Sequence, residues 1–288
     1  MKSRINRILD FFNEKLKTVG DSEELSISEK ELANLFAASE RTFEREFKKE
    51  LKTSYKQYFV RLRIEYAAYL LKNTQLTVAE VARKVGYTPS SLSKEFRKQF
   101  HTTPAQFRQN KLDAYIQHTQ RSYEEEQRPT MHLIYSSHIG NYSELDTEEK
   151  ECELFDKIEQ LAKEEGILKQ PVTYYGIAHD DADVREKEAC RFYACVEVEK
   201  PITQMSKEIN TLTIAAKKYA KYTHVGSYAG LDQLYEDVLC DLLFRPKDTF
   251  ELDPEFTILE RYLNDVQTTP EEQLITEVLF PISNKSLR

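Results

Sequence analysis

A single carboxylate stands in an apolar and aromatic row near the end of the chain. If residues 256–262 form a strand, Phe256, Ile258, Glu260 and Tyr262 share one face, because side chains alternate along a strand. Burying an unpaired carboxylate costs several kcal/mol. A bound organic cation could pair with it, and aromatic rings would add about 0.5–2 kcal/mol through cation–π contacts. The row therefore suggests a site for a cationic small molecule.

The tyrosine content favours this interpretation, but other interpretations stay open. Twelve of the 17 tyrosines follow residue 112, as an aromatic-lined site would require. Alternatively, Glu260 faces solvent while Thr257, Leu259 and Leu263 point inward. The region could also be a protein-interaction module without a ligand, or a hydrolase. For hydrolysis, His138 and His224 together with Glu260 are the only candidates, since the sequence offers no Ser/His/Asp or metal-binding pattern.

An internal repeat supplies the elements that would position this row. The pentapeptide His138–Tyr142 (HIGNY) recurs 86 positions later as His224–Tyr228 (HVGSY). Each copy ends a strand-like segment and precedes a helical pattern and two alternating runs. The segments are 130–138, 147–165, 172–179 and 191–198 in the first half, and 215–225, 231–244, 256–263 and 274–282 in the second. This order predicts β-α-β-β twice, an α+β domain.

Two helix-turn-helix patterns occupy the first part of the chain. One covers residues 77–108, with a helix to about Val85, a Gly86-Tyr87 turn, a helix from Pro89 and a third opened by Thr103-Pro104. The other covers residues 28–51, with Ser28 and Glu31 as an expected capping box and Ser39 capping the second helix. A helix over about 55–72 connects them, and another covers about 3–18. In such patterns the second helix enters the DNA major groove.

The later pattern resembles AraC/XylS-type transcription regulators. It reads A-x-x-x-G-Y, then S-L-S-K-x-F-R-K-x-F and T-P-x-x-F-R, and the resemblance covers residues 1–110. Its Gly86-to-Phe96 spacing is one residue shorter than is usual there. The resemblance implies double-stranded DNA as partner and an all-α twin helix-turn-helix domain. It places base-reading side chains on both recognition helices, at Arg41, Thr42, Glu44, Arg45, Ser90, Ser91, Lys94 and Arg97.

The duplicated half resembles the GyrI-like small-molecule-binding domain over about residues 131–283. The H-x-G-x-Y repeats and Leu259–Asp265 (LERYLND) carry this resemblance. It implies a groove between the two halves that holds a ligand, often an aromatic cation, over Glu260. Phe192-Tyr193 stands where related domains often have an aromatic residue and Asp. The expected ligand-binding residues are Tyr142, Tyr174, Phe192, Tyr228, Glu260 and Tyr262.

The charge distribution divides the chain in the same way. Residues 1–112 hold 22 Lys and Arg against 14 Asp and Glu, a net +8, and residues 113–288 hold 19 against 35, a net −16. The expected organisation is a DNA-binding domain over 1–112, a charged linker over 113–129 and an effector domain over 130–288. A basic domain suits phosphates, whereas an acidic one is repelled by them.

The remaining features predict a cytoplasmic protein. The start of the chain is charged and lacks a small-residue cleavage site, and no run approaches the roughly 18 apolar residues of a membrane span. The four cysteines form no CxxC pair, which is typical of reduced thiols. We expect no metal, no cofactor and no catalytic residues. Partners would be DNA, a small effector and, as one route of regulation, RNA polymerase.

Overall fold

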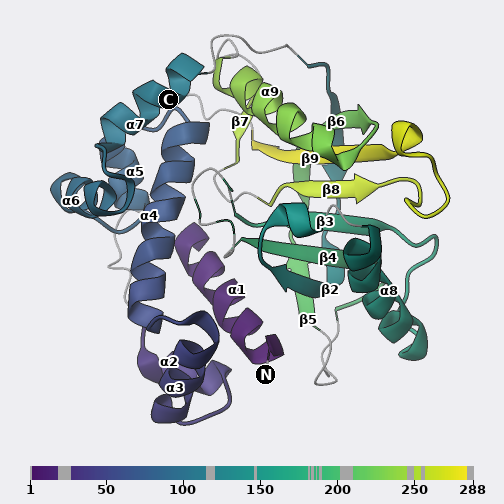
Figure 1. The fold of residues 1–288 in the computed structure, drawn as a ribbon, viewed down its shortest axis with the longest axis horizontal. Coiled ribbons are helices and arrows are strands. Elements are labelled where there is room, and N and C mark those ends of the chain that lie inside the picture. The colour runs from purple at the N-terminus through teal and green to yellow at the C-terminus, as the bar shows by residue number, and fades with distance from the viewer. Residues whose placement is uncertain are drawn as a thin grey trace. The chain divides into compact units, whose positions relative to one another are not determined.

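A computed structural model describes residues 2–18, 27–114, 121–145, 148–180, 182, 185, 187, 190–201, 210–244, 250–253 and 257–283. The chain divides into two compact units, 1–116 and 117–288, and each is described by itself. The first is helical and the second is built on an antiparallel sheet (Figure 1). Among the helices of the described ranges, none has the length and apolar character that crossing a bilayer needs.

The helical unit contains the two predicted helix-turn-helix motifs. Its helices are α1 (Lys2–Thr18), α2 (Glu29–Leu35), α3 (Glu40–Leu51), α4 (Tyr55–Asn73), α5 (Val78–Lys84), α6 (Pro89–Phe100) and α7 (Pro104–Ala114). Helices α2, α3 and α4 begin 49 residues before α5, α6 and α7, at 29, 40 and 55 against 78, 89 and 104. Figure 1 shows α2–α3 and α5–α6 at opposite ends of α4. Helices α2 and α5 have 7 residues each and α3 and α6 have 12 each, so the two motifs are equal in helix length and in turn length.

Caps and rings explain where these helices begin and how they pack. Ser39 and Thr88 each accept a hydrogen bond from the backbone three residues on, which starts α3 and α6. Phe12 of α1 packs against Phe47 and Phe59, with ring centroids 6.2 and 5.1 Å apart. Aromatic pairs of this kind add stability beyond the area they bury. One continuous apolar core thus joins α1 to the first motif and α4.

The capping box expected at Ser28 and Glu31 is wrong. The Ser28 side chain makes no capping hydrogen bond, and the Glu31 carboxylate lies 4.0 Å from Nζ of Lys15 instead. The reciprocal pattern occurs 49 positions later, where Thr77 and Glu80 exchange both capping hydrogen bonds at the start of α5. The S/T-x-x-E spacing is present at both places, but it forms a capping box only at Thr77 and Glu80.

The second unit is a nine-stranded antiparallel sheet with helices on one face. Its elements are β1 (Glu124–Arg128), β2 (Met131–Ile139), η2 (Tyr142–Glu144), α8 (Glu148–Glu164), β3 (Tyr174–Ala178), β4 (Arg191–Val198), β5 (Asn210–Ile214), β6 (Lys217–Val225), η4 (Tyr228–Gly230), α9 (Leu231–Phe244), β7 (Glu251–Leu252), β8 (Leu259–Tyr262), η5 (Glu271–Gln273) and β9 (Ile275–Ser283). The strand order is β1-β6-β9-β8-β3-β4-β2-β5, and β7 pairs with β9.

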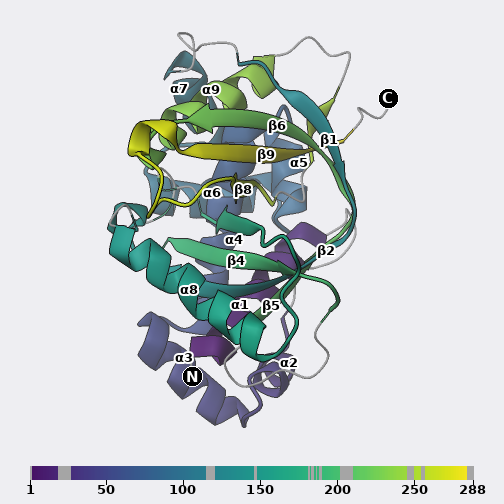
Figure 2. The same ribbon diagram turned by 90° about the vertical axis from the view of Figure 1, so that its right-hand side faces the viewer.

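The connections show that this sheet curls. Strands β5 and β6 are joined by two residues, yet β5 ends the strand order at one side and β6 lies next to the other end. Strands β1 and β2 are likewise joined by two residues, although β1 is at one end of the strand order and β2 is next to the other end. Loops this short span only ~10 Å, so the sheet must bring its ends together. Figure 2 shows it curving along β1 toward β2.

The two faces of the sheet have different cores. The inner face of the curl buries Tyr135, Tyr175, Tyr193 and Tyr219 among aliphatic side chains. On the outer face α8 packs over Ile134 of β2 together with Val196 of β4, and α9 packs over β6 and β9. The strand register shows that both helices cover this same outer face. Side chains of paired residues on neighbouring strands point to one face of the sheet. Such pairs run across the sheet through Val278 of β9, Glu260 of β8, Gly176 of β3 and Ala194 of β4.

The structure differs from the sequence expectation at three strands. Residues 124–128, predicted as linker, form β1, and Glu124 and Glu125 pair with lysines of β6 at 2.9 and 2.6 Å. Strands β5 and β7 were also not predicted. Strand β5 pairs with β2, and β7 pairs with β9. The other predicted elements are present within a few residues of their expected bounds. Residues 115–120, Thr147 and Phe256 fall outside the described ranges.

Candidate functional site

The residues expected to read bases lie along α3 and α6, from the first turn of each helix to Arg97 near the end of α6. The side chains of this set that are exposed are those of Arg41, Glu44, Arg45, Ser90, Ser91, Lys94 and Arg97, whereas Thr42 is half-buried. Each recognition helix thus presents basic and small polar groups on the side away from its core residues, Phe43 and Phe47 in α3 and Leu92 and Phe96 in α6. Such groups can bind base edges or phosphates.

Two members of that set have a local role in the helix starts. The Thr42 hydroxyl accepts a 2.9 Å hydrogen bond from Ser39, and the Ser91 hydroxyl accepts one of 2.9 Å from Thr88. Both residues also donate their backbone N–H to the same cap oxygen. Their hydroxyls therefore stabilise the capped first turn of each recognition helix.

Sequence reasoning missed Lys48 in this surface. Lys48 is exposed and precedes Arg97 by the 49 positions that relate the two motifs. The signal was available, because aligning SERTFEREFKKEL with TPSSLSKEFRKQF places the two cations together. Lys48 and Arg97 therefore occupy the same place on their helices.

Arg63 of α4 holds the turn of the second motif. Its Nε donates to the Val85 carbonyl at 2.7 Å and its Nη2 donates to the carbonyl of Gly86. The guanidinium also lies 3.9 Å from the ring centroid of Tyr87, a cation–π contact. Burial lowers the pKa of Arg63 from its usual value, but the charge has these partners. Gly86 has φ +69°, which explains the glycine at this turn.

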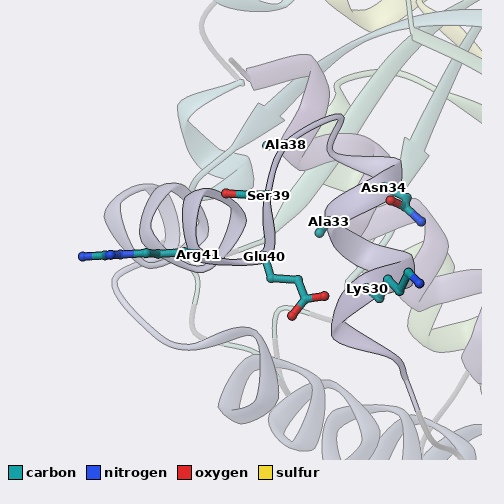
Figure 3. A pocket seen from close by; sticks show the side chains of 7 residues that line it. All are labelled: Lys30, Ala33, Asn34, Ala38, Ser39, Glu40 and Arg41. Carbon is teal, nitrogen blue, oxygen red and sulfur yellow. The ribbon is translucent and has the colours of Figure 1, made fainter.

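A cleft of about 430 Å³ lies between α2 and the start of α3. Its lining side chains are those of Lys30, Ala33, Asn34, Ala38, Ser39, Glu40 and Arg41 (Figure 3). Figure 3 shows the Arg41 side chain extending outward from α3, away from α2. The cleft borders the helix start at which Ser39 is the cap, so it belongs to the same surface as the expected base-reading residues.

The second candidate site is built around Glu260 on β8. Only 7% of this residue is exposed. Its two carboxylate oxygens accept hydrogen bonds from the phenols of Tyr235 on α9 and Tyr262 on β8, each at 2.8 Å. No Lys, Arg or His of the described residues forms an ion pair with it. Glu260 is thus a buried acid whose polar partners there are neutral phenols.

Burial determines how Glu260 titrates. Desolvation raises its pKa above the usual 4.5, the two phenols partly oppose the rise, and the negative charge of Asp232 adds to it. The alternative in which Glu260 faces solvent is wrong, because both Glu260 and its neighbour Leu259 are buried. Strand β8 lies inside the sheet with a covered surface on both faces, so alternation alone could not distinguish an inner from an outer side.

Aromatic rings surround this carboxylate on the outer face. The Tyr262 ring meets Tyr228 of η4 and Phe155 of α8 edge-to-face, with centroids 5.5 and 5.7 Å apart. Phe155 also meets Tyr174 of β3 at 5.7 Å. The expected residues Tyr174, Tyr228, Glu260 and Tyr262 are therefore joined in one cluster that spans both halves of the domain.

Phe192 and Gly176 complete the floor of the cluster. A Cβ added to Gly176 would lie 2.4 Å from the Tyr262 hydroxyl and 2.9 Å from Cζ of Phe192, so both rings lie against this glycine. Phe192 itself is 6% exposed and packs with Leu145 and Ala194. The expected Phe192 thus contacts the cluster through its edge, next to Tyr262.

Tyr142 and Tyr174 carry additional hydrogen bonds. The Tyr142 hydroxyl lies 3.0 Å from the carbonyl oxygens of both Asp180 and Arg191 and accepts from the Asp180 N–H, so it ties together the β3–β4 hairpin. Burial raises the pKa of Tyr142 well above 10. The Tyr174 hydroxyl donates to Glu159 of α8 at 2.7 Å, and burial followed by this hydrogen bond raises its pKa as well.

The histidines considered for catalysis have other partners. A ring nitrogen of His224 lies 2.8 Å from the Ser227 carbonyl, at the end of β6. Nε2 of His138 lies 3.9 Å from the Glu144 carboxylate in the corresponding turn. Both rings also lie against a nearby glycine, His138 against Gly140 and His224 against Gly230. The H-x-G-x-Y repeats thus organise the passage from strand to helix.

Three residues of the cluster were missed as ligand-site residues, namely Phe155, Gly176 and Tyr235. Tyr235 belongs to the inward stripe of α9, where a phenol needs a polar partner once buried. The sequence therefore indicated that the Tyr235 phenol makes a hydrogen bond, but it did not identify the acceptor. Phe155 and Gly176 come from the other half of the domain, and only the register of β3 against β8 brings them to Glu260.

Comparisons with known proteins agree with both halves of this description. Residues 121–283 match the family described as GyrI-like small molecule binding domain, and residues 32–110 match a helix-turn-helix domain family. The Msm operon regulatory protein of Streptococcus mutans is 36% identical over 63 residues, covering 22% of this chain and 23% of that protein. The transcriptional activator RhaS of Escherichia coli is 31% identical over 87 residues, covering 30% of this chain and 31% of RhaS.

This chain also resembles a solved structure over part of its length. The structure of SAV2435 bound to tetraphenylphosphonium has a TM-score of 0.38 and 15% identity, over 56% of this chain and 94% of that one. This chain spans 23% of the length of one of these curated relatives and 31% of the other. The match over residues 121–283 covers more than half of the 288 residues. The chain therefore belongs to the GyrI-like small molecule binding family, with an AraC-type helix-turn-helix domain ahead of that domain.

Proposed function

We propose that this transcription regulator binds double-stranded DNA through α3 and α6 and binds an aromatic organic cation at Glu260 as its effector. The observation that carries the effector assignment is the environment of Glu260. It is a buried carboxylate with two phenol donors, a surrounding ring cluster and no cationic partner in the described ranges. A carboxylate in such surroundings gains a counter-charge when a cation binds.

The DNA proposal rests on charge and spacing. Residues 1–112 have a net charge of +8, and the cations of α3 and α6 are exposed. Helix α4, with 19 residues, separates the motifs by roughly 28 Å at about 1.5 Å per residue. One turn of DNA is about 34 Å, so the recognition helices suit successive major grooves on one face.

We propose further that the effector domain is a duplicated β-α-β-β unit. The strands β2, β3 and β4 of one half correspond to β6, β8 and β9 of the other, and the halves meet where β3 pairs with β8. Registers support the correspondence. Ile139 ends β2 opposite Arg191 of β4, as Val225 ends β6 opposite Ile275 of β9. The cluster around Glu260 would then form at the junction of the two copies.

Binding, and not turnover, is the function proposed for this domain. A cation would add direct electrostatic pairing to the two phenol hydrogen bonds of Glu260, and the rings would contribute cation–π contacts of about 0.5–2 kcal/mol. Regulation would take place in the cytoplasm, where the effector changes how the helical domain binds DNA or contacts RNA polymerase.

Calorimetry with shape-matched ions tests the effector assignment. Tetraphenylphosphonium and tetraphenylborate have nearly the same shape and opposite charge. The full chain should bind the cation and not the anion, and Glu260→Gln should weaken cation binding at least tenfold, about 1.4 kcal/mol. Equal affinity for the two ions, or an unchanged cation affinity in Glu260→Gln, would exclude Glu260 as the partner of the cation.

A further inference from the structure

Gly176 occupies the position in the first half that corresponds to Glu260 in the second. Gly176 pairs with Ala194 of β4 as Glu260 pairs with Val278 of β9. Gly176 and Glu260 also pair with each other where β3 meets β8. A carboxylate at both positions would place two like charges side by side at the junction of the halves. Because position 176 is a glycine, Glu260 is the only carboxylate of this pair of positions.

The space that Gly176 leaves is occupied by the Tyr262 phenol. A Cβ at this position would lie 2.4 Å from the Tyr262 hydroxyl and 2.9 Å from Phe192 Cζ, closer than the 3.0 Å that real Cβ atoms keep. That hydroxyl is the donor to Oε2 of Glu260. Gly176 is not among the glycines with positive φ, so the position requires the absence of a side chain and not backbone freedom.

We infer that Gly176 shapes the effector site, because it leaves the room in which the Tyr262 hydroxyl reaches Glu260. It acts through Tyr262 and is therefore a positioning residue. A methyl group at this position would push the phenol off the carboxylate. The inference rests on the proposed function, since the carboxylate that Tyr262 stabilises is the proposed partner of the cation.

The groups that face Glu260 determine what this displacement would change. They are the phenols of Tyr235 on α9 and Tyr262 on β8, and the charge of Asp232 on α9. Both phenols favour the ionised carboxylate, whereas burial and Asp232 favour the neutral acid. With the Tyr262 hydroxyl withdrawn, one donor remains, so the carboxylate ionises only at higher pH. Cation binding should follow that ionisation.

The test measures tetraphenylphosphonium binding to the full chain by calorimetry across pH. The variants are Gly176→Ala, Tyr262→Phe and the two combined. In each single variant the pH of half-maximal binding should rise by about one unit, a tenfold loss of the ionised acid below that pH. The double variant should show no further rise, because both changes remove the same hydrogen bond. If the rises in the pH of half-maximal binding in the two single variants add up in the double variant, the inference is overturned.

Gly166→Ala is the matched control. A Cβ at Gly166 meets nothing within 4 Å, but its φ of +65° strains any other residue. This variant should melt at a lower temperature and keep the binding midpoint of the parent. If Gly166→Ala shifts the midpoint as much as Gly176→Ala does, the effect is one of general stability and the inference fails.

A ligand-independent readout separates this inference from the proposed function. The Glu260 carboxyl can be titrated by ¹³C NMR in the ligand-free chain, where Gly176→Ala should raise its pKa and Tyr262→Phe should raise it equally. An unchanged pKa in Gly176→Ala overturns the inference even if the cation binds. Absence of cation binding in the parent overturns the proposed function, and the titration still decides the role of Gly176.

The variant Gly176→Ala could also fail to accumulate as folded protein. The double variant lacks the hydroxyl that the new Cβ would meet at 2.4 Å, so it should then fold better than the single variant. A double variant that folds no better would show that the crowding involves other atoms, and the inference would be overturned.

Discussion

At the scale of single residues, Glu260 combines burial with an incomplete set of partners. Its two oxygens each have one phenol donor at 2.8 Å, and burial still raises its pKa. A neutral phenol stabilises a carboxylate less than a cation does, so the empty site retains part of the cost of burying the charge. That residual cost is what a bound cation would relieve.

Replacing Glu260 by Gln should change how stability depends on pH. The folded pKa lies above the unfolded value, so folded protein binds the proton more tightly. The free energy of unfolding should therefore fall as pH rises from about 4.5 through the raised pKa, by about 1.4 kcal/mol per unit of difference. Glu260→Gln should lack this decline and be at least as stable as the parent at pH 8. Urea unfolding followed by circular dichroism at several pH values measures both, and parallel pH profiles would refute the prediction.

Arg45 tests the base-reading assignment on α3. Its side chain is 70% exposed and forms a surface ion pair with Glu46 at 3.0 Å, which costs little to exchange for a base edge. Arg45→Ala should cost about 1–3 kcal/mol on a selected DNA site and relax preference at one base pair. Fluorescence anisotropy would measure the affinity of the parent and of Arg45→Ala for the selected site and for random DNA of equal length. An equal loss on both would identify Arg45 as a phosphate contact.

The sequence predicted part of the effector cluster for a physical reason. Alternation on one strand placed Tyr262 beside Glu260, and the pair is hydrogen-bonded as that spacing allows. Tyr235, Phe155 and Gly176 come from other elements, and their approach depends on how β3 pairs with β8 and how α8 and α9 pack. Such contacts between distant segments leave no periodic signal in a single sequence.

At the scale of elements, β1 shows why a charged segment was mistaken for a linker. Its sequence EEEQR has no apolar residue, yet each glutamate pairs with a cation on the sheet. Arg261 of β8 binds Glu126 with both Nη atoms at 2.9 Å and donates its Nε to Glu277 at 2.7 Å. Charge complementarity across the curl holds this strand, and hydrophobic patterning cannot detect it.

The half-buried and exposed ion pairs of β1 should differ in their contribution to stability. Burial alone would raise the pKa of Glu126, but the hydrogen bonds and charge of Arg261 bring it below 4.5. Glu126→Gln should therefore cost about 1–3 kcal/mol near neutral pH. This stabilisation should disappear as pH falls through the depressed pKa.

Glu124→Gln is the matched control on the same strand. The Glu124 side chain is 78% exposed and its pair with Lys221 lies at the surface, so its loss should cost at most about 0.5 kcal/mol. Urea unfolding of both variants at pH 7 makes the comparison. Equal losses would show that the bidentate contact with Arg261 adds nothing beyond a surface pair.

Helices were easier to predict than strands in this chain. The 3- and 4-residue spacing of apolar positions and the Ser/Thr caps act within one segment, and they placed α3, α5 and α6 closely. Strand β5 reads NTLTI, five residues that contribute two buried side chains, Asn210 and Ile214. Its pairing with β2 depends on the curl of the sheet, which local spacing does not encode.

At the scale of the whole chain, charge and architecture assign different partners to the two domains. The basic first domain carries two equal motifs for DNA, and the acidic second domain contains the buried Glu260. A regulator of this design requires the two binding events to be coupled, because an effector can shift DNA binding only through a difference in affinity between states. The coupling free energy is therefore the quantity at the centre of the account.

The most direct measurement is the affinity of the full chain for a selected DNA fragment with and without saturating tetraphenylphosphonium. The account predicts a change of at least about fivefold, with DNA changing the affinity for the cation by the same factor, because coupling is reciprocal. Glu260→Gln should bind the DNA as the parent does without cation and show no response to it. An unchanged DNA affinity in the cation-saturated parent, or an equal response in Glu260→Gln, would contradict the account.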